Sequence, residues 1–284
     1  MQLETFKKFK DFELLDTGAG YRLERWGKFI LQRPDPQIIW ERHLPDSEWE
    51  KCDAKFINGD WIVLSKIPKS WQVSWEDISL VAKLSPFKHT GIFAEQAANW
   101  EWMLEKSKIR NQKSKLRILN LFAYTGGATI ALAKSGCFVT HVDASKPSIA
   151  WAKENQAVNK LPQDSIRWIL DDAAKFVARE LKRKSFYDGI IMDPPAFGHG
   201  PTGNTWKFNE NLPPLLKDAV QLLSPEAKFL VINGYATNSS ALALKNTLED
   251  ASVDLKGKIE FGELCLEQSD KRLISTGIFA RWSQ

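Results

Sequence analysis

Hydrophobic and polar residues alternate differently in the two parts of this 284-residue chain. Up to residue 84 the apolar residues form short runs bounded by turn signals, and no long helical period occurs. Residues 21–32 have the composition of a strand, Pro34-Asp35-Pro36 ends that run, and Asn58-Gly59-Asp60 precedes another run at 61–64. We therefore expect residues 1–84 to form a small β-rich or α+β domain.

From residue 116 onward, apolar runs of strand length alternate with helical segments. The pattern predicts strands at 116–122, 138–142, 166–170, 187–192 and 228–233, and helices at 128–134, 147–159, 173–184, 212–223 and 241–250. Such alternation is typical of a parallel sheet covered by helices on both faces. Two consecutive strands at 258–266 and 272–282 predict an antiparallel C-terminal hairpin. The expected fold is an α/β, Rossmann-like, mostly parallel sheet over residues 85–284.

A glycine-containing loop follows the first of these strands. It reads Phe122-Ala-Tyr124-Thr125-Gly126-Gly127 and leads into a helix. Ligands of open α/β sheets bind beyond the carboxyl ends of the strands, where glycine lets the backbone approach and a helix presents its first amides. The spacing is not that of a dinucleotide site, because Ala128 and Ala131 occupy glycine positions of that fingerprint. This disfavours a nicotinamide oxidoreductase, and a simple tight turn is the alternative interpretation.

Acidic residues end the next three strands. Asp143 lies 17 residues after Gly126 (143 minus 126), where a carboxylate can accept hydrogen bonds from both hydroxyls of a ribose, or else cap the following helix. In the pair Asp171-Asp172 we expect Asp172 to accept the amino group of an adenine and the other acid to cap a helix. Asp193-Pro194-Pro195-Ala196-Phe197 predicts a rigid turn with unpaired carbonyls directed into the site.

Composition limits the class of protein. The net charge is +4 (39 basic minus 35 acidic residues), with 43% hydrophobic and 26% charged residues, which is typical of a globular chain. A polyanionic partner is permitted but not required, and most of the 12 Trp are expected to be core or hairpin residues. No apolar run is long enough for a membrane span or a signal peptide. Cys52, Cys137 and Cys265 are scattered, so we expect no disulfide framework, no metal site and a cytoplasmic setting.

The strands and loops together resemble the class I S-adenosylmethionine-dependent methyltransferases. The string from Asn120 to Gly127 is similar to that of the large-subunit ribosomal RNA methyltransferases, a family that includes the enzymes making 5-methylcytosine and 7-methylguanine in 23S rRNA. Residues 88–102 look like the segment leading into the methyltransferase domain of those enzymes, and residues 198–207 look like their substrate-side loop. Many relatives carry an N-terminal RNA-binding PUA domain, and we expect the N-terminal segment here to be too short to hold that domain as well as the small β-rich unit.

The resemblance implies S-adenosyl-L-methionine as cofactor and ribosomal RNA as the expected partner. It also implies two sets of site residues. Asp193, Pro194, Pro195 and Phe197 are the expected catalytic residues. The expected cofactor-binding residues are Phe93, Gln96, Asn120, Phe122, Tyr124, Thr125, Gly126, Asp143, Ser145, Asp172 and Asp193.

The chemistry of methyl transfer favours nitrogen over carbon as the acceptor atom. A carbon of cytosine becomes nucleophilic only through a covalent cysteine adduct, and no Cys follows the fourth or fifth strand. A nitrogen acceptor needs only hydrogen-bond acceptors such as Asp193 and a proline carbonyl, with Phe197 or Trp206 to stack on a flipped base. The turn is similar to the Asn/Asp-Pro-Pro-aromatic tetrad of amino-methylating enzymes, except that Ala196 is inserted.

Two other functions stay open at this point. An enzyme of the same fold could methylate a protein side chain, such as a glutamine amide, or a small molecule. A cofactor-binding or RNA-binding module without catalysis is the other alternative, although Gly126, Asp143 and Asp193 are all retained. The sequence leaves the methylated atom and the oligomeric state undetermined.

Overall fold

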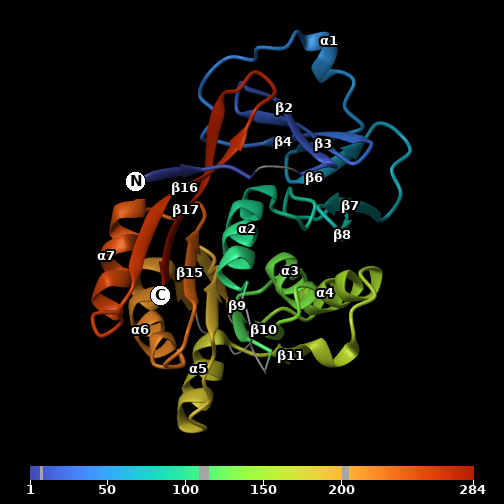
Figure 1. The fold of residues 1–284 in the computed structure, drawn as a ribbon. Coiled ribbons are helices and arrows are strands. Elements are labelled where there is room, and N and C mark those ends of the chain that lie inside the picture. Colours follow the sequence, from blue (N-terminus) through green and yellow to red (C-terminus); the bar gives the residue numbers. More distant parts are fainter. Residues whose placement is uncertain (7–8, 109–114, 200–204) are drawn as a thin grey trace. The chain divides into compact units, whose positions relative to one another are not determined.

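The computed structural model describes residues 1–6, 9–108, 115–199 and 205–284. Figure 1 labels its helices and strands. The chain forms two compact units. The large unit comprises Met1–Glu4, Ala98–Leu264 and Ser275–Gln284, and the small unit comprises Thr5–Ala97 and Cys265–Ile274. The expected domain boundary between residues 84 and 85 stays a prediction, and each unit is described by itself.

An eight-stranded sheet forms the centre of the large unit (Figure 1). Its strands, in spatial order, are β1 (Gln2–Glu4), β16 (Lys258–Glu267), β17 (Leu273–Ser283), β15 (Phe229–Gly234), β12 (Gly189–Met192), β9 (Arg117–Leu121), β10 (Phe138–Asp143) and β11 (Ile166–Leu170). Strands β15, β12, β9, β10 and β11 pair in parallel, whereas β17 is antiparallel to β15. This confirms the predicted sheet, and its strand order reverses between β9 and β12.

Six helices of eight or more residues accompany this sheet in the described part of the chain: α2 (Ala97–Lys106), α3 (Gly127–Lys134), α4 (Lys146–Val158), α5 (Ala173–Lys182), α6 (Phe208–Val220) and α7 (Ala241–Ala251). The short 3-10 helix η2 (Gln163–Ser165) precedes β11. Helix α6 begins four residues before the predicted start at 212, because Phe208 is buried in the core. Pro213 and Pro214 therefore lie inside the helix.

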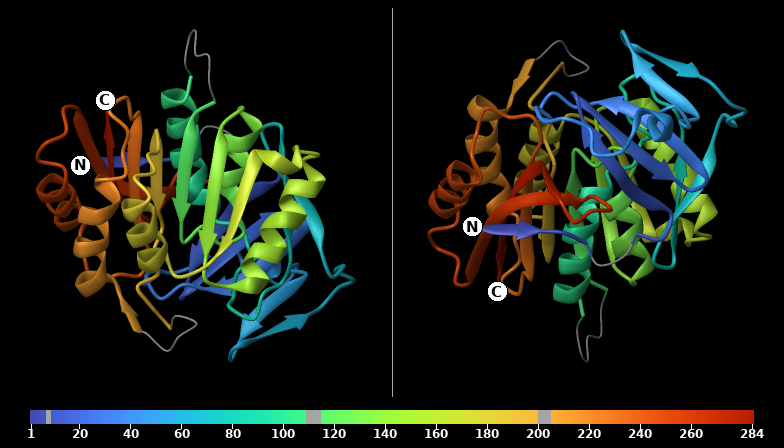
Figure 2. Two further views of the ribbon diagram at one scale, coloured as in Figure 1. Left: turned by 90° about the horizontal axis from the view of Figure 1, so that it is seen from below. Right: turned by 90° about the horizontal axis from the view of Figure 1, so that it is seen from above.

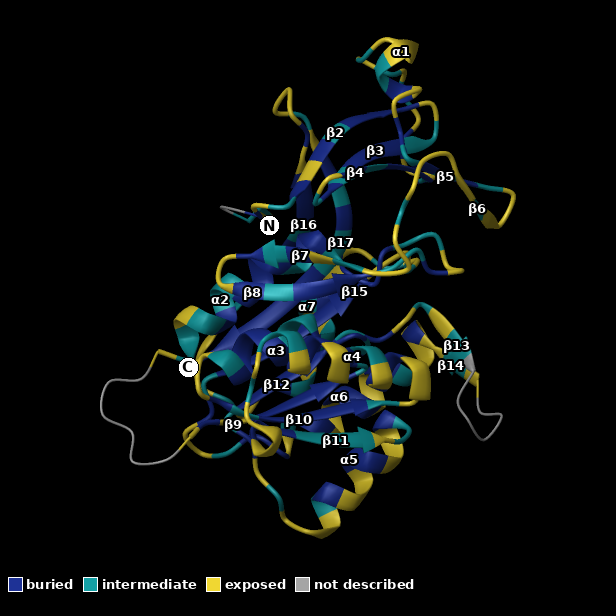
Figure 3. Ribbon diagram, turned by 90° about the vertical axis from the view of Figure 1, so that its right-hand side faces the viewer, coloured by how far each residue is buried: buried dark blue, intermediate teal, exposed yellow. Residues whose placement is uncertain are grey.

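A hydrophobic core of the large unit lies between one face of the sheet and helices α5, α6 and α7 (Figure 2). Leu119 and Leu121 of β9 and Val142 of β10 belong to this core. Side chains alternate across a strand, so Asn120 and His141 face the other side of the sheet. Figure 3 shows the central strands buried and the outer surfaces of α4 and α5 exposed.

The small unit is rich in β-structure, as predicted. A five-stranded sheet has the order β2 (Phe12–Gly18), β3 (Tyr21–Trp26), β4 (Phe29–Pro34), β5 (Ala54–Ile57) and β6 (Asp60–Val63). A hairpin of β7 (Trp71–Trp75) and β8 (Ile78–Ala82), the short helix α1 (Asp46–Trp49) and the 3-10 helix η1 (Ala94–Gln96) complete it. Trp26, Trp49 and Trp75 are fully buried in this unit.

Two buried ion pairs cross the sheet of the small unit. Arg22 pairs with Asp35, and Arg33 donates two hydrogen bonds to Glu24, at 2.6 Å from Nε and 2.9 Å from Nη2. Burial works to raise the pKa of Glu24, but the charges of Arg33 and Arg22 and their hydrogen bonds outweigh it and lower that pKa. All four side chains are thus satisfied as charged pairs, the condition under which ionised groups are tolerated in a core.

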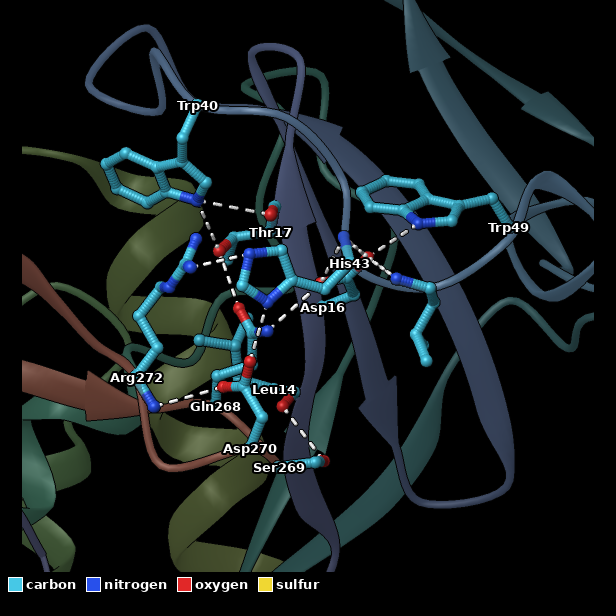
Figure 4. A network of polar contacts seen from close by, with 11 residues as sticks. Leu14, Asp16, Thr17, Trp40, His43, Trp49, Gln268, Ser269, Asp270 and Arg272 are labelled. Atoms are coloured by element: carbon cyan, nitrogen blue, oxygen red, sulfur yellow. Dashed lines mark hydrogen bonds and ion pairs between the residues drawn. The ribbon is translucent and has the colours of Figure 1, made fainter.

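The connection between β16 and β17 completes the small unit (Figure 4). The fully buried carboxylate of Asp16 accepts hydrogen bonds from Trp49 Nε1 (2.9 Å), Gln268 Nε2 (3.0 Å) and the amides of His43 and Leu44. Thr17 Oγ1 donates to Gln268 Oε1 at 2.6 Å. A buried carboxylate is costly unless such donors surround it, so Gln268 is a structural part of this unit.

Candidate active site

The β9 loop, residues Phe122–Gly126, lies directly after β9 at the point where the strand order of the sheet reverses. Three of its residues have left-handed backbone conformations: Phe122 (φ +56°), Tyr124 (φ +49°) and Gly126 (φ +82°). Non-glycine residues rarely adopt such angles unless the surrounding structure holds them. Local contacts provide that support, since the Ala123 amide donates to Val142 O and the Gly126 amide to Ala123 O.

Glycine is required at the start of α3 for steric reasons. A Cβ on Gly126 would lie 3.2 Å from Cβ of Ala152 and 3.4 Å from Cε1 of His141, in a conformation that already favours glycine. A Cβ on Gly127 would come within 2.4 Å of the Trp100 ring. The loop thus packs closely against its neighbours. The first amides of α3 follow the loop, and their N–H groups have no hydrogen-bond acceptor within the helix.

Asp143, the last residue of β10, holds the β9 loop from the side. Its Oδ2 accepts the amide hydrogen of Tyr124 at 2.7 Å, and its Oδ1 accepts that of Ser145 at 2.8 Å. Burial raises the pKa of Asp143 above its ordinary value, and the two amide hydrogen bonds partly oppose that rise. Each carboxylate oxygen can still accept a second hydrogen bond. Ser145 caps α4 through its Oγ, which accepts from the Ser148 amide.

A buried polar chain lies beneath the β9 loop. Asn120 Nδ2 donates to Thr129 Oγ1 at 2.9 Å, and Thr129 Oγ1 lies 3.0 Å from His141 Nδ1. The His141 ring packs 4.6 Å from the ring of Trp168. Burial lowers the pKa of His141 to about 3, although its interaction with the main chain of Tyr124 opposes that shift. Asn120, an expected cofactor residue, therefore uses its amide to fix the base of the loop.

Thr125 contributes to the loop through its main chain. Its carbonyl accepts a hydrogen bond of 2.8 Å from Asn155 Nδ2 of α4, and its side chain is buried. Burial, followed by the charge of Asp143, raises the pKa of the Tyr124 hydroxyl well above its usual range. The Tyr124 ring lies 6.4 Å from that of Trp151. The loop is thus tied to both α4 and β10.

Asp171 and Asp172, which follow β11, make different contacts. Asp172 is the N-cap of α5, and its Oδ1 accepts the Lys175 amide at 3.0 Å. Asp171 pairs with Arg179 and its amide donates to Asp143 O at 3.1 Å. The capping role therefore falls on Asp172, the acid expected to bind adenine, and only one of its two oxygens serves the cap.

The β12 turn, residues Asp193–Phe197, follows the strand next to β9. The Asp193 amide donates to Leu121 O of β9 at 3.4 Å. The expectation that the proline carbonyls are left unpaired is wrong for Pro195, because Trp206 Nε1 donates to its oxygen at 2.7 Å. The hairpin of β13 (Phe197–His199) and β14 (Thr205–Lys207), which brings Trp206 back over the turn, explains the difference.

The two aromatic residues expected to stack on a base have different surroundings. Phe197 is 58% exposed, whereas the Trp206 ring is half-buried and lies 4.9 Å from the ring of Phe122. Of the substrate-side loop predicted at 198–207, residues 200–204 lie outside the described residues. Phe93 and Gln96 belong to the small unit, where the Gln96 amide donates to Phe93 O and the Phe93 ring packs 5.3 Å from His89.

The large unit thus gathers the β9 loop, Asp143, Asp172 and the β12 turn at the carboxyl ends of four parallel strands. Residues 41–263 match the sequence profile of the S-adenosylmethionine-dependent methyltransferases, and the chain belongs to this family. Its cofactor is therefore S-adenosylmethionine. Among the described residues, no group of His, Cys, Asp and Glu could hold a metal ion, and no helix is long and apolar enough to cross a membrane.

Two curated relatives define the similarity more closely. Ribosomal RNA large subunit methyltransferase I of Citrobacter koseri is 31% identical over 285 residues, which are 96% of this chain and 67% of that enzyme. Ribosomal RNA large subunit methyltransferase K/L of a Shewanella species is 33% identical over 192 residues, which are 66% of this chain and 25% of that enzyme. The chain therefore spans about two thirds and one quarter, respectively, of these relatives.

Solved structures share the whole fold. An S-adenosylmethionine-dependent methyltransferase from Agrobacterium tumefaciens is 36% identical, with a TM-score of 0.95 over 100% of this chain and 93% of that one. The methyltransferase SMU.776, crystallised with SAH, is 18% identical, with a TM-score of 0.76 over 97% of this chain and 76% of that one. The second likeness is one of fold alone.

Sequence reasoning missed two contacts that support the loops of the site. Thr129 Oγ1 lies 3.0 Å from His141 Nδ1, which connects α3 with β10, and the polar residues Thr140 and His141 inside the run 138–142 were the signal for this contact. Trp206 was considered for stacking, but nothing in the sequence indicated its hydrogen bond to Pro195. Both contacts depend on which faces of separate elements meet.

Proposed function

We propose that this methyltransferase modifies a nitrogen of an RNA base, with large-subunit ribosomal RNA as the acceptor. The observation that carries the proposal is the β12 turn, which places Asp193 and two prolines at the end of the strand beside the β9 loop. The names of the two curated relatives support ribosomal RNA as the acceptor. A cytoplasmic setting agrees with that acceptor.

The residues of the large unit fit S-adenosylmethionine. Asp143 keeps acceptor capacity for two ribose hydroxyls, and the second oxygen of Asp172 can accept an adenine amino group. The close packing of Gly126 and Gly127 leaves no room for a side chain where the backbone must approach the ligand. When bound, the cofactor supplies a methyl group on a positively charged sulfur. We propose that Phe122, Tyr124, Thr125 and Ser145 shape this site. The cofactor-binding role expected for Phe93 and Gln96, which belong to the small unit, stays a prediction.

Asp193 is the proposed catalytic residue. Its carboxylate would accept a hydrogen bond from the N–H of the acceptor and orient the nitrogen. It would take the proton as the carbon–nitrogen bond forms and the methyl carbon–sulfur bond breaks, which would leave a neutral thioether. The carbonyl of Pro194 would accept a second hydrogen bond, because that of Pro195 is already occupied by Trp206. The exposed ring of Phe197 would stack on the base.

The cysteines argue against methylation of a base carbon. All three are buried: Cys52 lies in the small unit, Cys137 precedes β10 and Cys265 lies within β16. Burial raises the pKa of the Cys52 and Cys137 thiols, which disfavours the thiolate that a covalent adduct requires. None of the three follows the carboxyl end of β12 or β15.

Radiolabelled S-adenosylmethionine tests the proposal with 23S rRNA and total protein from a strain lacking the gene. We expect label in a nitrogen of a 23S rRNA base and a loss of at least about 100-fold in rate for Asp193→Ala, since general-base contributions are about 10²–10⁴-fold. Calorimetric affinity for S-adenosylmethionine should stay within a few-fold of wild type.

Asp254→Ala, which removes an exposed carboxylate of the large unit, is the matched control and should keep full activity. Full activity of Asp193→Ala would refute the role given to Asp193. Label in protein or small molecules alone would refute the acceptor, and a covalent adduct with 5-fluorocytosine RNA would refute the choice of nitrogen.

A further inference from the structure

Trp206 contacts both loops of the candidate active site. Its indole Nε1 donates to Pro195 O of the β12 turn at 2.7 Å, and its ring packs on Phe122 of the β9 loop, with centroids 4.9 Å apart and planes inclined by 56°. One side chain from β14 therefore connects the loops that follow two adjacent parallel strands, β9 and β12.

Both loops need such support. Phe122 has φ of +56°, a left-handed conformation that a non-glycine residue keeps only when its neighbours hold it. Prolines 194 and 195 carry no amide hydrogen, so the β12 turn cannot be fixed by donors of its own at these positions. It is fixed instead through its carbonyls, with Pro195 O bonded to Trp206 and Ala196 O accepting the Phe208 amide at 3.1 Å.

The backbone of β14 sets the position of Trp206. Trp206 lies opposite Gly198 in the antiparallel pairing of β13 and β14, and Thr205 lies opposite His199. The Lys207 amide donates to Asn211 Oδ1 of α6 at 2.7 Å, and buried Phe208 begins α6. The backbone that carries Trp206 is thus anchored to a strand pair on one side and to the start of α6 on the other, so its side chain can keep the two loops at a constant separation.

We propose that Trp206 is a positioning residue for methyl transfer, which fixes the acceptor side of the site relative to the cofactor side. In this role the indole supports the two loops instead of stacking on the acceptor: its N–H donates to Pro195 O and its ring packs on Phe122. Phe197, more than half exposed at the end of the same turn, is the ring that meets the acceptor base. This inference rests on the proposed function for the identities of the two sides.

Trp206→Phe and Trp206→Ala separate the two contacts. Phenylalanine keeps an aromatic ring against Phe122 but lacks the N–H, so we expect S-adenosylmethionine affinity within about twofold of wild type and a kcat lower by about tenfold or more. A misplacement of about 1 Å can cost about 100-fold in rate. Alanine removes both contacts, so its affinity for S-adenosylmethionine should also fall, by about tenfold.

The matched control is Trp71→Phe in the small unit. Its indole Nε1 likewise donates to a main-chain carbonyl, that of Trp26, at 3.1 Å. This variant loses the same kind of hydrogen bond and should keep wild-type kcat and affinity for S-adenosylmethionine.

The stacking role of Phe197 is tested by a separate variant. Phe197→Leu should raise KM for 23S rRNA several-fold while leaving the affinity for S-adenosylmethionine unchanged.

Hydrogen exchange tests the inference without any acceptor. Trp206→Ala should speed amide exchange in the segments containing Phe122–Gly126 and Ala196–Phe197 by about tenfold or more, and Trp206→Phe should do so in the second segment alone. Unchanged exchange in both segments would overturn the positioning role, as would a Trp206→Phe enzyme with wild-type kcat. If wild-type protein fails to label rRNA, the acceptor proposal fails, and the exchange and affinity results still decide the role of Trp206.

Discussion

His141 is a buried histidine that is held neutral by its surroundings. One ring nitrogen faces Thr129 Oγ1, while Nε2 is buried without a partner in hydrogen-bond geometry among the described residues. A charged imidazole here would have to give up hydration without a compensating anion. Burial also raises the pKa of Asp143, at the end of the same strand, although the amide hydrogen bonds from Ser145 and Tyr124 oppose that rise.

We predict that His141 makes folding stability fall as the pH decreases. Its pKa is about 6.5 in the unfolded chain and about 3 in the folded protein. Between pH 3 and 6.5 the unfolded state binds more protons than the folded state. The contribution of His141 to the free energy of unfolding is therefore complete above pH 6.5, and it falls by roughly 1.4 kcal/mol for each pH unit below that value until the pH reaches about 3. In urea denaturation between pH 4 and 7, the slope of the free energy of unfolding against pH should be smaller for His141→Gln than for wild type, by roughly 1.4 kcal/mol per pH unit.

Val139→Ala is the control for that slope. It truncates a buried, uncharged residue of the same strand, so it should lower stability equally at every pH. His89, whose pKa burial lowers to about 4, contributes a similar slope, and His89→Gln with His141→Gln should flatten the profile further. A His141→Gln profile parallel to wild type would contradict the buried, neutral histidine.

Most elements of the large unit were predictable from the sequence, because each follows from a local pattern. Apolar runs such as 166–170 match β11, and acids or glycines end the strands where the structure ends them. Helix α2 was not predicted, and the start of α6 was placed four residues too late, so that Pro213 and Pro214 lie inside the helix. Proline is usually excluded from helix interiors, so the core contact of Phe208 overrides the local preference.

The packing of α3 against α2 supplies a prediction about these two helices. A Cβ on Gly127 would overlap the buried Trp100 ring at 2.4 Å. Overpacking of a core costs about 1–3 kcal/mol, so Gly127→Ala should lower the free energy of unfolding by about that much in urea denaturation. Trp100→Phe removes the ring atoms that would clash, so the loss from adding a methyl group at position 127 should be smaller in that background.

The double-variant comparison decides between a steric and a conformational cause. If the two substitutions destabilise the protein additively, the clash with Trp100 is not what requires glycine at position 127. Gly127, unlike Gly126, does not have a left-handed φ. Backbone strain therefore does not contribute to the stability change measured for Gly127→Ala. A Gly127→Ala protein as stable as wild type would contradict the close packing of α2 and α3.

The candidate site was predictable to the extent that it depends on strand ends. Asp143, Asp172 and Asp193 come together because parallel strands place their carboxyl ends at one edge. The hydrogen bond from Trp206 to Pro195 and the chain from Asn120 to His141 were not predictable, since each joins residues of different elements. The grouping of Cys265–Ile274 with residues 5–97 is likewise a property of the folded chain alone.

Strands β16 and β17 run from the large unit into the small unit, which leads to a prediction about the chain as a whole. Gln268 is buried between Asp16 and Thr17, donating to one and accepting from the other. Gln268→Ala leaves a buried carboxylate without one of its donors, a change that costs about 1–3 kcal/mol or more for a charged group. Because the two strands are continuous, we expect one unfolding transition to shift as a unit.

Urea denaturation followed by both near-ultraviolet circular dichroism and hydrogen exchange measures that shift in each unit separately. Ser269→Ala, which removes an exposed hydroxyl from the same connection, should change the free energy of unfolding by no more than about 0.5 kcal/mol. Gln268→Glu should cost more than Gln268→Ala, because a second carboxylate beside Asp16 adds charge repulsion to the lost hydrogen bond. Two separate transitions, with only residues 5–97 affected, would show that the continuous strands do not couple the units.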